Sequence, residues 1–282
     1  MKKICAITGG TGGIGFGTAK IMGKTHALLI GDLNQEKVDI AVAELQGMGF
    51  EAEGMVVDVT ERNQVTAFAQ KAAGMGIVQA VTHLAGLTAL FAPPAEILKV
   101  NALGTMIVNE EFYKVMGAGS CIMDICSAAA YMLPTDRIPL DVFELSRTNK
   151  ETFYEKIVEQ VPSDAPESLQ QGMAYTYSRC FIKWYVKDCS FNFGKKGIRV
   201  VSVSPNNILT DMQVLDMEKS GNLDVTLTYS PFGRRGTVEE ATFLISTLVD
   251  ERNSYVTGVD ILCDGGCYAS GFVGQRTPRS EV

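Results

Sequence analysis

A glycine-rich stretch near the N-terminus has the residue types and spacing that most directly indicate chemistry. It reads Thr8-Gly-Gly-Thr-Gly-Gly-Ile-Gly15 and lies between an apolar run and a helical pattern. Glycine is needed where a Cβ would collide with phosphate or where φ is positive, and the first amides of a following helix attract negative charge. The stretch is typical of a loop that holds a dinucleotide pyrophosphate, and an ordinary glycine-rich turn is the alternative.

Two acidic residues follow the next two apolar runs. Asp32 stands near the point, about 20 residues after the glycine motif, where an acid bonds the adenosine ribose hydroxyls and repels a 2′-phosphate. This placement favours NAD over NADP, and a helix cap is the other interpretation. Asp58 could meet the adenine edge or cap a helix, and the residues leave both open.

Two further polar residues stand where they could face the same ligand. Asn101 lies among apolar residues near the start of a helical pattern, and is either a satisfied kink or a site residue. Ser127 follows an apolar run and would bring a hydroxyl to the ligand edge of a sheet, although serine at a strand end is often only a turn residue.

Apolar runs alternate with helical patterns along the chain, and these elements must position the residues named above. The alternation predicts an α/β fold with a doubly wound, Rossmann-type parallel sheet. We expect residues 1–282 to form one domain of this kind. The expected strands are residues 4–7, 27–30, 51–57, 77–84, 120–126, 198–204 and 258–263. The expected helices are residues 13–23, 34–47, 61–74, 96–116, 174–193 and 238–249, with a loop over 87–97.

Residues 131–173 interrupt this alternation. They contain several prolines and two amphipathic pieces, residues 140–147 and 150–161. The pattern predicts an inserted helical segment or lid without a sheet strand of its own, placed before the helix that opens at Ala174.

Composition excludes several classes of function. The 282 residues are 46% hydrophobic and carry a net charge of −7, which argues against nucleic-acid binding because that draws on clustered Lys and Arg. No apolar run approaches the ~20 residues of a membrane span, and Met-Lys-Lys leads straight into a strand. We therefore expect no membrane partner and a cytoplasmic location. Seven scattered cysteines and only two histidines predict buried thiols and no metal site.

Taken together, these motifs resemble the short-chain dehydrogenase/reductase family in order and spacing over nearly the whole chain. Thr8 to Gly15 is similar to its cofactor loop, and Ala85-Gly86 keeps the end of its Asn-Asn-Ala-Gly strand motif. Further segments that match are Asn101, Ser127, Tyr175, Ile198-Arg-Val through Pro205 and Thr210, Gly233-Arg-Arg-Gly, Ser254 to Gly258 and Asp264-Gly-Gly266. The short loop before Asn101 and the insert before Tyr175 resemble the branch of bacterial 3α-hydroxysteroid dehydrogenase/carbonyl reductases.

The resemblance implies reversible hydride transfer between nicotinamide and a carbonyl carbon, with a proton moving at the oxygen. Tyr175 would be the acid/base, Ser127 would hold the substrate oxygen and Asn101 would position a water or the helix behind the site. A tyrosine ordinarily titrates near pH 10, so nearby positive charge is needed. The cofactor-binding residues implied by the resemblance are Gly9, Thr11, Gly13, Ile14, Gly15, Asp32, Leu33, Asp58, Val59, Ala85, Gly86, Tyr175, Arg179, Pro205, Ile208 and Thr210.

The sequence departs from the family at the catalytic helix. The family has Tyr-xxx-Lys, and here Arg179 stands four residues after Tyr175, still on the same helix face. Arginine supplies charge and hydrogen bonds to ribose but stays protonated, so it is a poor proton relay. Tyr177 has Phe181 one turn on and no charge there, and Lys183 lies two turns from Tyr175, too far to replace the lysine.

Two other departures are milder. Asn206 stands where the family usually has glycine, and asparagine tolerates positive φ better than most residues. His83 and Leu84 replace the two asparagines of the strand motif.

Two classes of function remain open from the sequence. The first is an NAD-dependent oxidoreductase that acts on a small apolar secondary alcohol or ketone. Apolar residues near the crevice suggest a steroid-like or other cyclic substrate. Those residues are Tyr131, Met132, Leu133, Phe143, Phe153, Met212, Leu215 and Met217, which could instead pack the lid on its own domain. The second is an NAD-binding protein with weakened or lost redox activity, with an NAD-using epimerase as a further alternative. The resemblance also implies a homo-oligomer, a dimer or tetramer, through the helices that start at Asn101 and Tyr175.

Overall fold

The computed structural model describes residues 2–89, 92–210 and 225–271. Seven parallel strands form one sheet in the order β3-β2-β1-β4-β5-β6-β7. They are β1 (Lys3–Thr8), β2 (Ala27–Asp32), β3 (Ala52–Val56), β4 (Ile77–His83), β5 (Cys121–Ile125), β6 (Arg199–Pro205) and β7 (Val259–Cys263). The strand order reverses between β1 and β4, and ligands of such sheets bind at that point, beyond the carboxyl ends of the strands.

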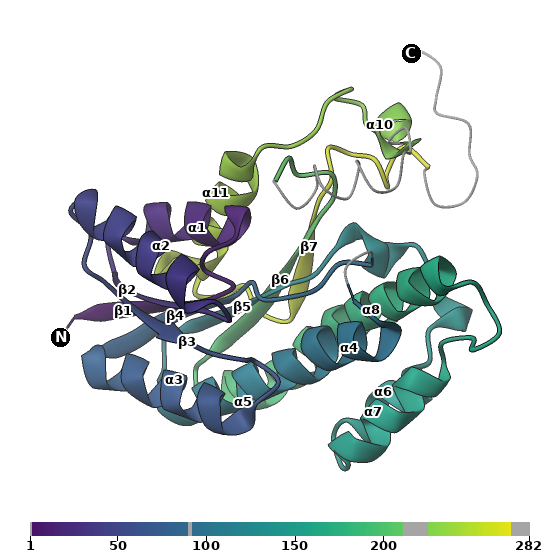
Figure 1. Ribbon diagram of the computed structural model, residues 1–282, viewed down its shortest axis with the longest axis horizontal. Coiled ribbons are helices and arrows are strands. Elements are labelled where there is room, and N and C mark those ends of the chain that lie inside the picture. The colour runs from purple at the N-terminus through teal and green to yellow at the C-terminus, as the bar shows by residue number, and fades with distance from the viewer. Residues whose placement is uncertain (1, 90–91, 211–224, 272–282) are drawn as a thin grey trace.

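Helices cover both faces of the sheet (Figure 1). One face carries α1 (Gly13–Met22), α2 (Gln35–Gly47) and α11 (Val238–Val249), and the other carries α3 (Arg62–Met75), α5 (Thr105–Val115) and α8 (Glu167–Lys195). Alternate strand residues supply the two cores, so Cys5 and Ile7 pack on the α1 and α11 side while Ile4 and Ala6 pack on the α3 and α5 side. The Rossmann-type fold predicted from the alternating pattern is confirmed.

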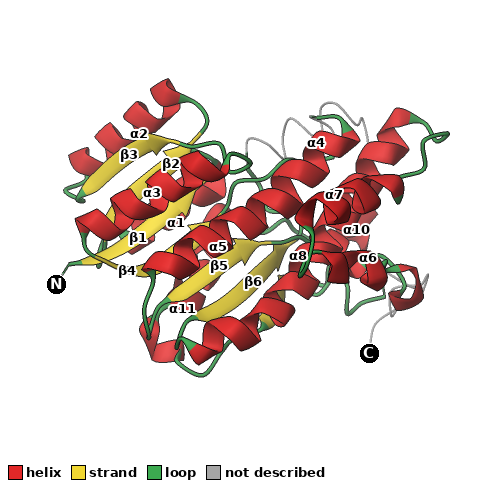
Figure 2. Cartoon of the chain, turned by 90° about the horizontal axis from the view of Figure 1, so that it is seen from below, coloured by secondary structure: helices red, strands yellow, loops and turns green. Residues whose placement is uncertain are grey.

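The insert forms α6 (Leu140–Leu145) and α7 (Lys150–Glu159), which lie beside α8 in Figures 1 and 2. Asn149 caps α7 by accepting a bond of 3.0 Å from the Thr152 amide. Phe143 of α6 and Phe153 of α7 are fully buried against Phe181 of α8. The apolar positions of the insert therefore form a core with the face of α8, and residues 131–173 add no strand to the sheet.

Two predicted boundaries were wrong. The segment expected to be a loop over 87–97 contains helix α4 (Pro94–Leu98), because Pro94 stands at a first helical position where its missing N–H costs nothing. The helix expected from residue 174 begins at Glu167, directly after Pro166. Its first turns are polar, and Gln170 donates to the Ala165 carbonyl, so no apolar period marked them.

Smaller elements complete the described chain. They are α10 (Val225–Tyr229), a π-helical turn (Lys99–Gly104) and 3-10 turns at Ala128–Tyr131, Thr135–Arg137 and Glu251–Asn253. Among the described residues, no helix has both the length and the apolar character that crossing a membrane requires.

Candidate active site

The loop between β1 and α1 is shaped by contacts that only glycine permits. Gly9 has φ of 67°, and a Cβ there would lie 2.6 Å from the Ala85 amide nitrogen. A Cβ on Gly15 would lie 2.1 Å from the Gly9 carbonyl oxygen. No side chain caps α1, whose N-cap residue is Gly12, so amides of its first turn stay available to an anion. The loop is pressed against the end of β4 and has the form of a phosphate cradle.

Asp32 holds this loop from the end of β2. Its Oδ2 accepts bonds from the Thr11 amide at 3.2 Å and the Thr11 hydroxyl at 2.6 Å, and its Oδ1 accepts from the Leu33 amide. Asn34, rather than Asp32, caps α2 by accepting from the Lys37 amide. The interpretation of Asp32 as a helix cap is therefore wrong, and a half-buried carboxylate stands beside the cradle.

Asp58 organises the turn that follows β3. Its Oδ1 accepts bonds of 2.8 Å from both the amide and the hydroxyl of Thr60, while Glu61 takes the N-cap position of α3. Val59 is buried, and its Cγ2 lies 2.9 Å from the position of a Cβ on Gly104. Asp58 thus caps a turn instead of the helix, and contact of this pair with adenine stays a prediction.

Asn101 lies in the π-helical turn before α5, a feature that is frequent at functional sites. Its Oδ1 accepts from the Leu87 amide at 2.8 Å, and its Nδ2 donates to the Leu87 carbonyl at 3.0 Å and the Ser178 hydroxyl at 3.1 Å. Ser178 in turn donates to the Tyr175 carbonyl. Asn101 is therefore both a satisfied helix irregularity and a link between the loop after β4 and α8.

Arg179 of α8 is buried, with 4% of its surface exposed. It donates to the Ile125 carbonyl at 2.9 Å, and its guanidinium carbon lies 4.8 Å from the centroid of the Tyr175 ring. A Cβ on Gly86 would lie 3.0 Å from the Arg179 Nη2 and 3.1 Å from the Asn101 Oδ1. The structure thus brings Gly86, Asn101, Tyr175 and Arg179 together.

The charge on Arg179 has no carboxylate partner in an ion pair among the described residues, and its Nε has no hydrogen-bond partner there. Burial, and then the nearby Arg179 charge, lower the pKa of His83 to about 3. A buried, unpaired cation stabilises any negative charge that forms beside it. The group in ring contact with it is Tyr175.

Ser127 follows β5 and caps the 3-10 turn Ala128–Tyr131. Its Oγ accepts a bond of 3.2 Å from the Ala129 amide. That bond uses a lone pair, so the O–H can still donate to a substrate oxygen. Ser127 is both a turn residue and a half-buried hydroxyl at the carboxyl end of its strand.

The segment that leaves β6 returns over the cradle. Ile208 is buried and pairs with Gly236, and the Thr210 methyl group lies 3.4 Å from the position of a Cβ on Gly13. The positive φ of this segment, 51°, belongs to Asn207. The sequence had suggested Asn206 for this conformation, and that placement was wrong by one residue, because Asn206 continues the strand by donating to the Cys263 carbonyl.

Comparison with known proteins agrees with this geometry. Residues 3–136 match the family model described as short chain dehydrogenase, and residues 156–268 match the model described as Enoyl-(Acyl carrier protein) reductase. A short-chain dehydrogenase/reductase of Alternaria brassicicola is 32% identical over 272 residues, covering 95% of this chain and 97% of the relative. The chain belongs to the short-chain dehydrogenase/reductase family.

Solved structures of short-chain dehydrogenase/reductases share the fold. One from Mycobacterium ulcerans has a TM-score of 0.75 at 22% identity and covers 95% of this chain and 90% of its own. One from Burkholderia cenocepacia, in complex with NADP, has a TM-score of 0.74 at 20% identity and covers 94% of this chain and 98% of its own. These likenesses show the fold, and the family matches make the protein an oxidoreductase of a family that binds nicotinamide cofactors.

Of the residues after Tyr175, the sequence did not single out Ser178, and it noted Lys183 only as too distant to replace the missing lysine. Ser178 lies three residues after Tyr175. The sequence feature that could have indicated it is a small polar residue on the buried side of a helix. Lys183 places its Nζ 3.2 Å from the centroid of the Tyr131 ring, and the Tyr131 hydroxyl donates to Asp260 at 2.6 Å. Lys183 therefore belongs to a second polar cluster, with Tyr131 and Asp260, at the β7 edge of the sheet.

The apolar residues suggested for substrate contact separate into four groups. Tyr131 belongs to the polar cluster with Lys183 and Asp260. Phe143 and Phe153 are fully buried in the insert core, so the crevice contact suggested for them was wrong. Met132 and Leu133, five and six positions beyond Ser127, are exposed and half-buried. Met212, Leu215 and Met217 lie outside the described residues.

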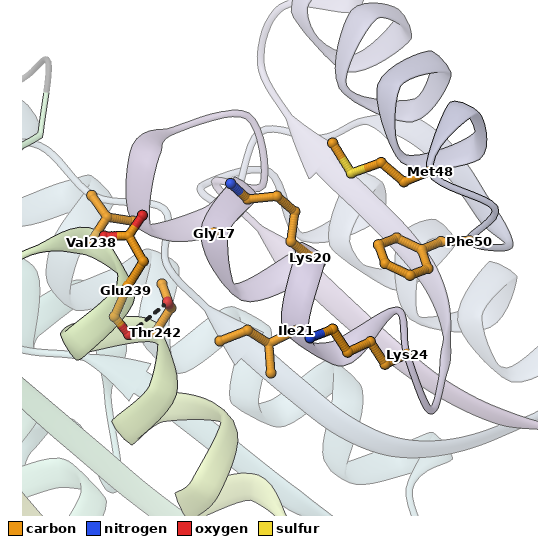
Figure 3. Close-up of a pocket in the computed structure, with 9 residues that line it drawn as sticks. All are labelled: Gly17, Lys20, Ile21, Lys24, Met48, Phe50, Val238, Glu239 and Thr242. Carbon is orange, nitrogen blue, oxygen red and sulfur yellow. Dashed lines mark hydrogen bonds between the residues drawn. The ribbon is translucent and has the colours of Figure 1, made fainter.

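A pocket lies between α1, α11 and the end of α2 (Figure 3). Its lining residues are Gly17, Lys20, Ile21, Lys24, Met48, Phe50, Val238, Glu239 and Thr242. None of them is among the predicted site residues of this short-chain dehydrogenase/reductase.

Proposed function

We propose that this protein is an NAD-dependent oxidoreductase that interconverts a secondary alcohol and a ketone. The observation that carries the proposal is the buried guanidinium of Arg179 in contact with the Tyr175 ring, beside Gly86 and Asn101. Nicotinamide, when bound, supplies or accepts the hydride. The residues of the chain must therefore hold the substrate oxygen and move its proton.

Tyr175 is the proposed proton donor and acceptor. In ketone reduction its hydroxyl gives a proton to the substrate oxygen, and in alcohol oxidation its phenolate takes that proton back. Arg179 stabilises the phenolate by its charge without giving up a proton of its own. Ser127 donates to the substrate oxygen, and Asn101 holds the Leu87 backbone and Ser178 in place around these groups.

The proposed cofactor is NAD. A Cβ at Gly9 or Gly15 would collide with main-chain atoms of the loop and of the β4 end. A loop without side chains at these positions fits a cradle that phosphates approach closely. The Asp32 carboxylate beside Thr11 favours ribose hydroxyls and repels a 2′-phosphate. A solved structure of the same fold is a complex with NADP, so we infer that a preference for NAD depends on residues such as Asp32.

The proposed substrates are apolar, and cyclic or steroid-like alcohols belong in the test panel because Met132 and Leu133 lie just beyond Ser127. We further propose that the protein works in the cytoplasm as a homo-oligomer, as the family resemblance implied. These properties follow from composition and resemblance.

The test measures NADH absorbance with a panel of secondary, cyclic and steroid alcohols, using wild type, Tyr175→Phe, Arg179→Met and Arg179→Lys. We expect the Tyr175→Phe variant to lose a factor of about 10²–10⁴ in kcat, the usual contribution of a general acid/base. Arg179→Met loses about 10²–10³ because a preorganised charge is removed. Arg179→Lys keeps most of the activity, since the charge remains.

Three results would contradict the proposal. Unchanged activity of Tyr175→Phe rules out the assigned acid/base. NAD binding without turnover by the wild type, together with turnover by Arg179→Lys, favours a binding protein with lost redox activity. Net conversion of an alcohol stereocentre without NADH accumulation favours an epimerase.

A further inference from the structure

Four buried residues form a chain of hydrogen bonds between the phosphate cradle and the catalytic π-helical turn. The Thr8 hydroxyl lies 2.7 Å from the His83 Nδ1, the His83 Nε2 lies 3.1 Å from the Thr105 hydroxyl, and that hydroxyl donates to the Asn101 carbonyl at 2.6 Å. No member is more than 1% exposed. Water therefore has little access to compete for these bonds.

The direction of every bond follows from the last one. A carbonyl oxygen only accepts, so the single Thr105 hydroxyl proton goes to Asn101. Thr105 must then accept from His83, which requires a proton on Nε2. In a neutral imidazole, Nδ1 is then left as an acceptor for the Thr8 hydroxyl. The hydrogen bonds thus exclude the Nδ1–H tautomer. The doubly protonated form is excluded because burial and the Arg179 charge lower the pKa of His83 to about 3.

The two ends of the chain belong to different parts of the site. Thr8 is the last residue of β1, directly before Gly9, and stands opposite His83 in the sheet register. At the other end the Thr105 amide bonds the Ala102 carbonyl, while the Thr105 hydroxyl takes the Asn101 carbonyl. The position of Asn101 thus depends on a side chain anchored through His83 to the start of the cradle.

We propose that His83 is a positioning residue that fixes Asn101, and through it Ser178 and the catalytic helix, relative to the cofactor cradle. The inference rests on the proposed function, because it assigns His83 an effect on hydride transfer. His83 does not act as an acid or base here. Burial and the Arg179 charge lower its pKa to about 3, which keeps the imidazole neutral at working pH.

The first test reads the tautomer without using activity. The chain has only two histidines, so a long-range ¹H–¹⁵N spectrum of labelled wild-type protein shows two imidazoles, and His26→Gln assigns them. We expect His83 to show the Nε2–H pattern with no titration between pH 5 and 9. A Nδ1–H pattern, or a titrating His83, would overturn the hydrogen-bond chain.

The second test separates positioning from simple structural support. His83→Phe and Thr105→Val each break the chain, whereas Thr105→Ser keeps the hydroxyl and His83→Gln keeps one donor and one acceptor. We expect the two breaking variants to lose about 10–100-fold in kcat, since small displacements of catalytic groups have effects of this size. The NADH dissociation constant stays nearly unchanged, because the cradle is held by backbone packing at Gly9 and Gly15.

The double variant His83→Phe/Thr105→Val should be no slower than the worse single variant, because both break one chain. His83→Gln and Thr105→Ser should recover most of the rate. Additive losses, or equal losses in kcat and NADH affinity that track a lowered Tm, would show a merely structural role and overturn the proposal. If the wild type turns over no substrate, the proposed function fails, and the spectrum still decides whether the chain exists.

Discussion

The two halves of the site are held in different ways. On the cofactor side, the critical contacts are made by the backbone, as when a Cβ on Gly9 or Gly15 would strike main-chain atoms. On the catalytic side, around β5 and α8, they are made by buried side chains, as with Arg179 on the Ile125 carbonyl and Asn101 on Leu87. A backbone cradle depends on a short local sequence, whereas the catalytic side depends on residues that are distant along the chain.

The unusual arginine belongs to the side that is held by side chains. Arg179 bonds the Ile125 carbonyl at the end of β5, and its guanidinium reaches the space beside Gly86. Its neighbours there include side chains, namely Asn101 and the Tyr175 ring. At Gly9 and Gly15, by contrast, the atoms nearest to a new Cβ are main-chain atoms.

The sharpest test of the comparison changes two glycines of the cradle. Gly15→Ala would place a Cβ 2.1 Å from the Gly9 carbonyl oxygen, so the loop must move. Overpacking of this kind costs about 3 kcal/mol at its upper range, and we expect the NADH dissociation constant to rise by about 100-fold. Titration of NADH fluorescence measures it.

Gly12→Ala is the matched control for that change. Gly12 has φ of −76°, and its Cβ would come no closer than 3.6 Å to the Gly9 carbonyl oxygen. Its NADH affinity should stay near that of the wild type. Equal weakening by both variants would mean that the cradle is sensitive to any side chain and not to the backbone contacts described.

The same difference decides what could be predicted from the sequence. The seven strands could be predicted because each depends on local apolar runs. The phosphate cradle and the role of Asp32 were predicted from local spacing and stay predictions. The sequence placed Asn101, Ser127, Tyr175 and Arg179 together through family resemblance, since no local pattern indicates that residues of different strands and helices meet. The structure brings Asn101, Tyr175 and Arg179 into contact through Gly86 and Ser178.

What the sequence could not predict depends on distant packing. His83 was noted only as a departure from a motif, because its partners Thr8 and Thr105 lie far from it in the chain. For Phe143 and Phe153 the sequence left crevice contact and packing of the lid both open, because an amphipathic pattern does not say which surface its apolar face meets. Phe181 of α8 covers them. The first turns of α8 are polar, so no apolar period indicated where this helix begins.

A smaller effect is expected from Asp32, which belongs to the cofactor side but acts through its side chain. Asp32→Ala removes the carboxylate that faces the Thr11 hydroxyl and amide. Relief of charge repulsion should shift the ratio of kcat/KM for NADP over NAD by about tenfold or more toward NADP. Asp39→Ala, on the exposed surface of α2, is the control and should leave the ratio unchanged. An unchanged ratio in Asp32→Ala would remove the basis for the NAD preference.

The smallest effect on activity is expected at Asp124, in the core of the catalytic side, where a substitution changes stability alone. Asp124 is fully buried on β5, and its Oδ2 accepts from the Asn109 amide nitrogen at 2.7 Å. Its Oδ1 and the Asn109 Oδ1 have no partner among the described residues. Burial raises the pKa of Asp124 to about 7, against an opposing effect of the Asn109 bond.

The sign of the pH dependence follows from that raised pKa. Between pH 4 and 7 the folded protein keeps a proton on Asp124 that the unfolded chain has released, so this group's stabilisation is lost as pH rises through the window. Asp124→Asn carries an amide that can donate to the Asn109 Oδ1 at every pH. We expect the stability of Asp124→Asn relative to wild type to rise by about 1 kcal/mol per pH unit in this window and to level off above pH 7. Urea unfolding at several pH values measures it, and a constant difference would place an ionised carboxylate in the core. The cofactor side, held by main-chain contacts, has no reason to share this slope, and Gly12→Ala should follow the wild type at every pH.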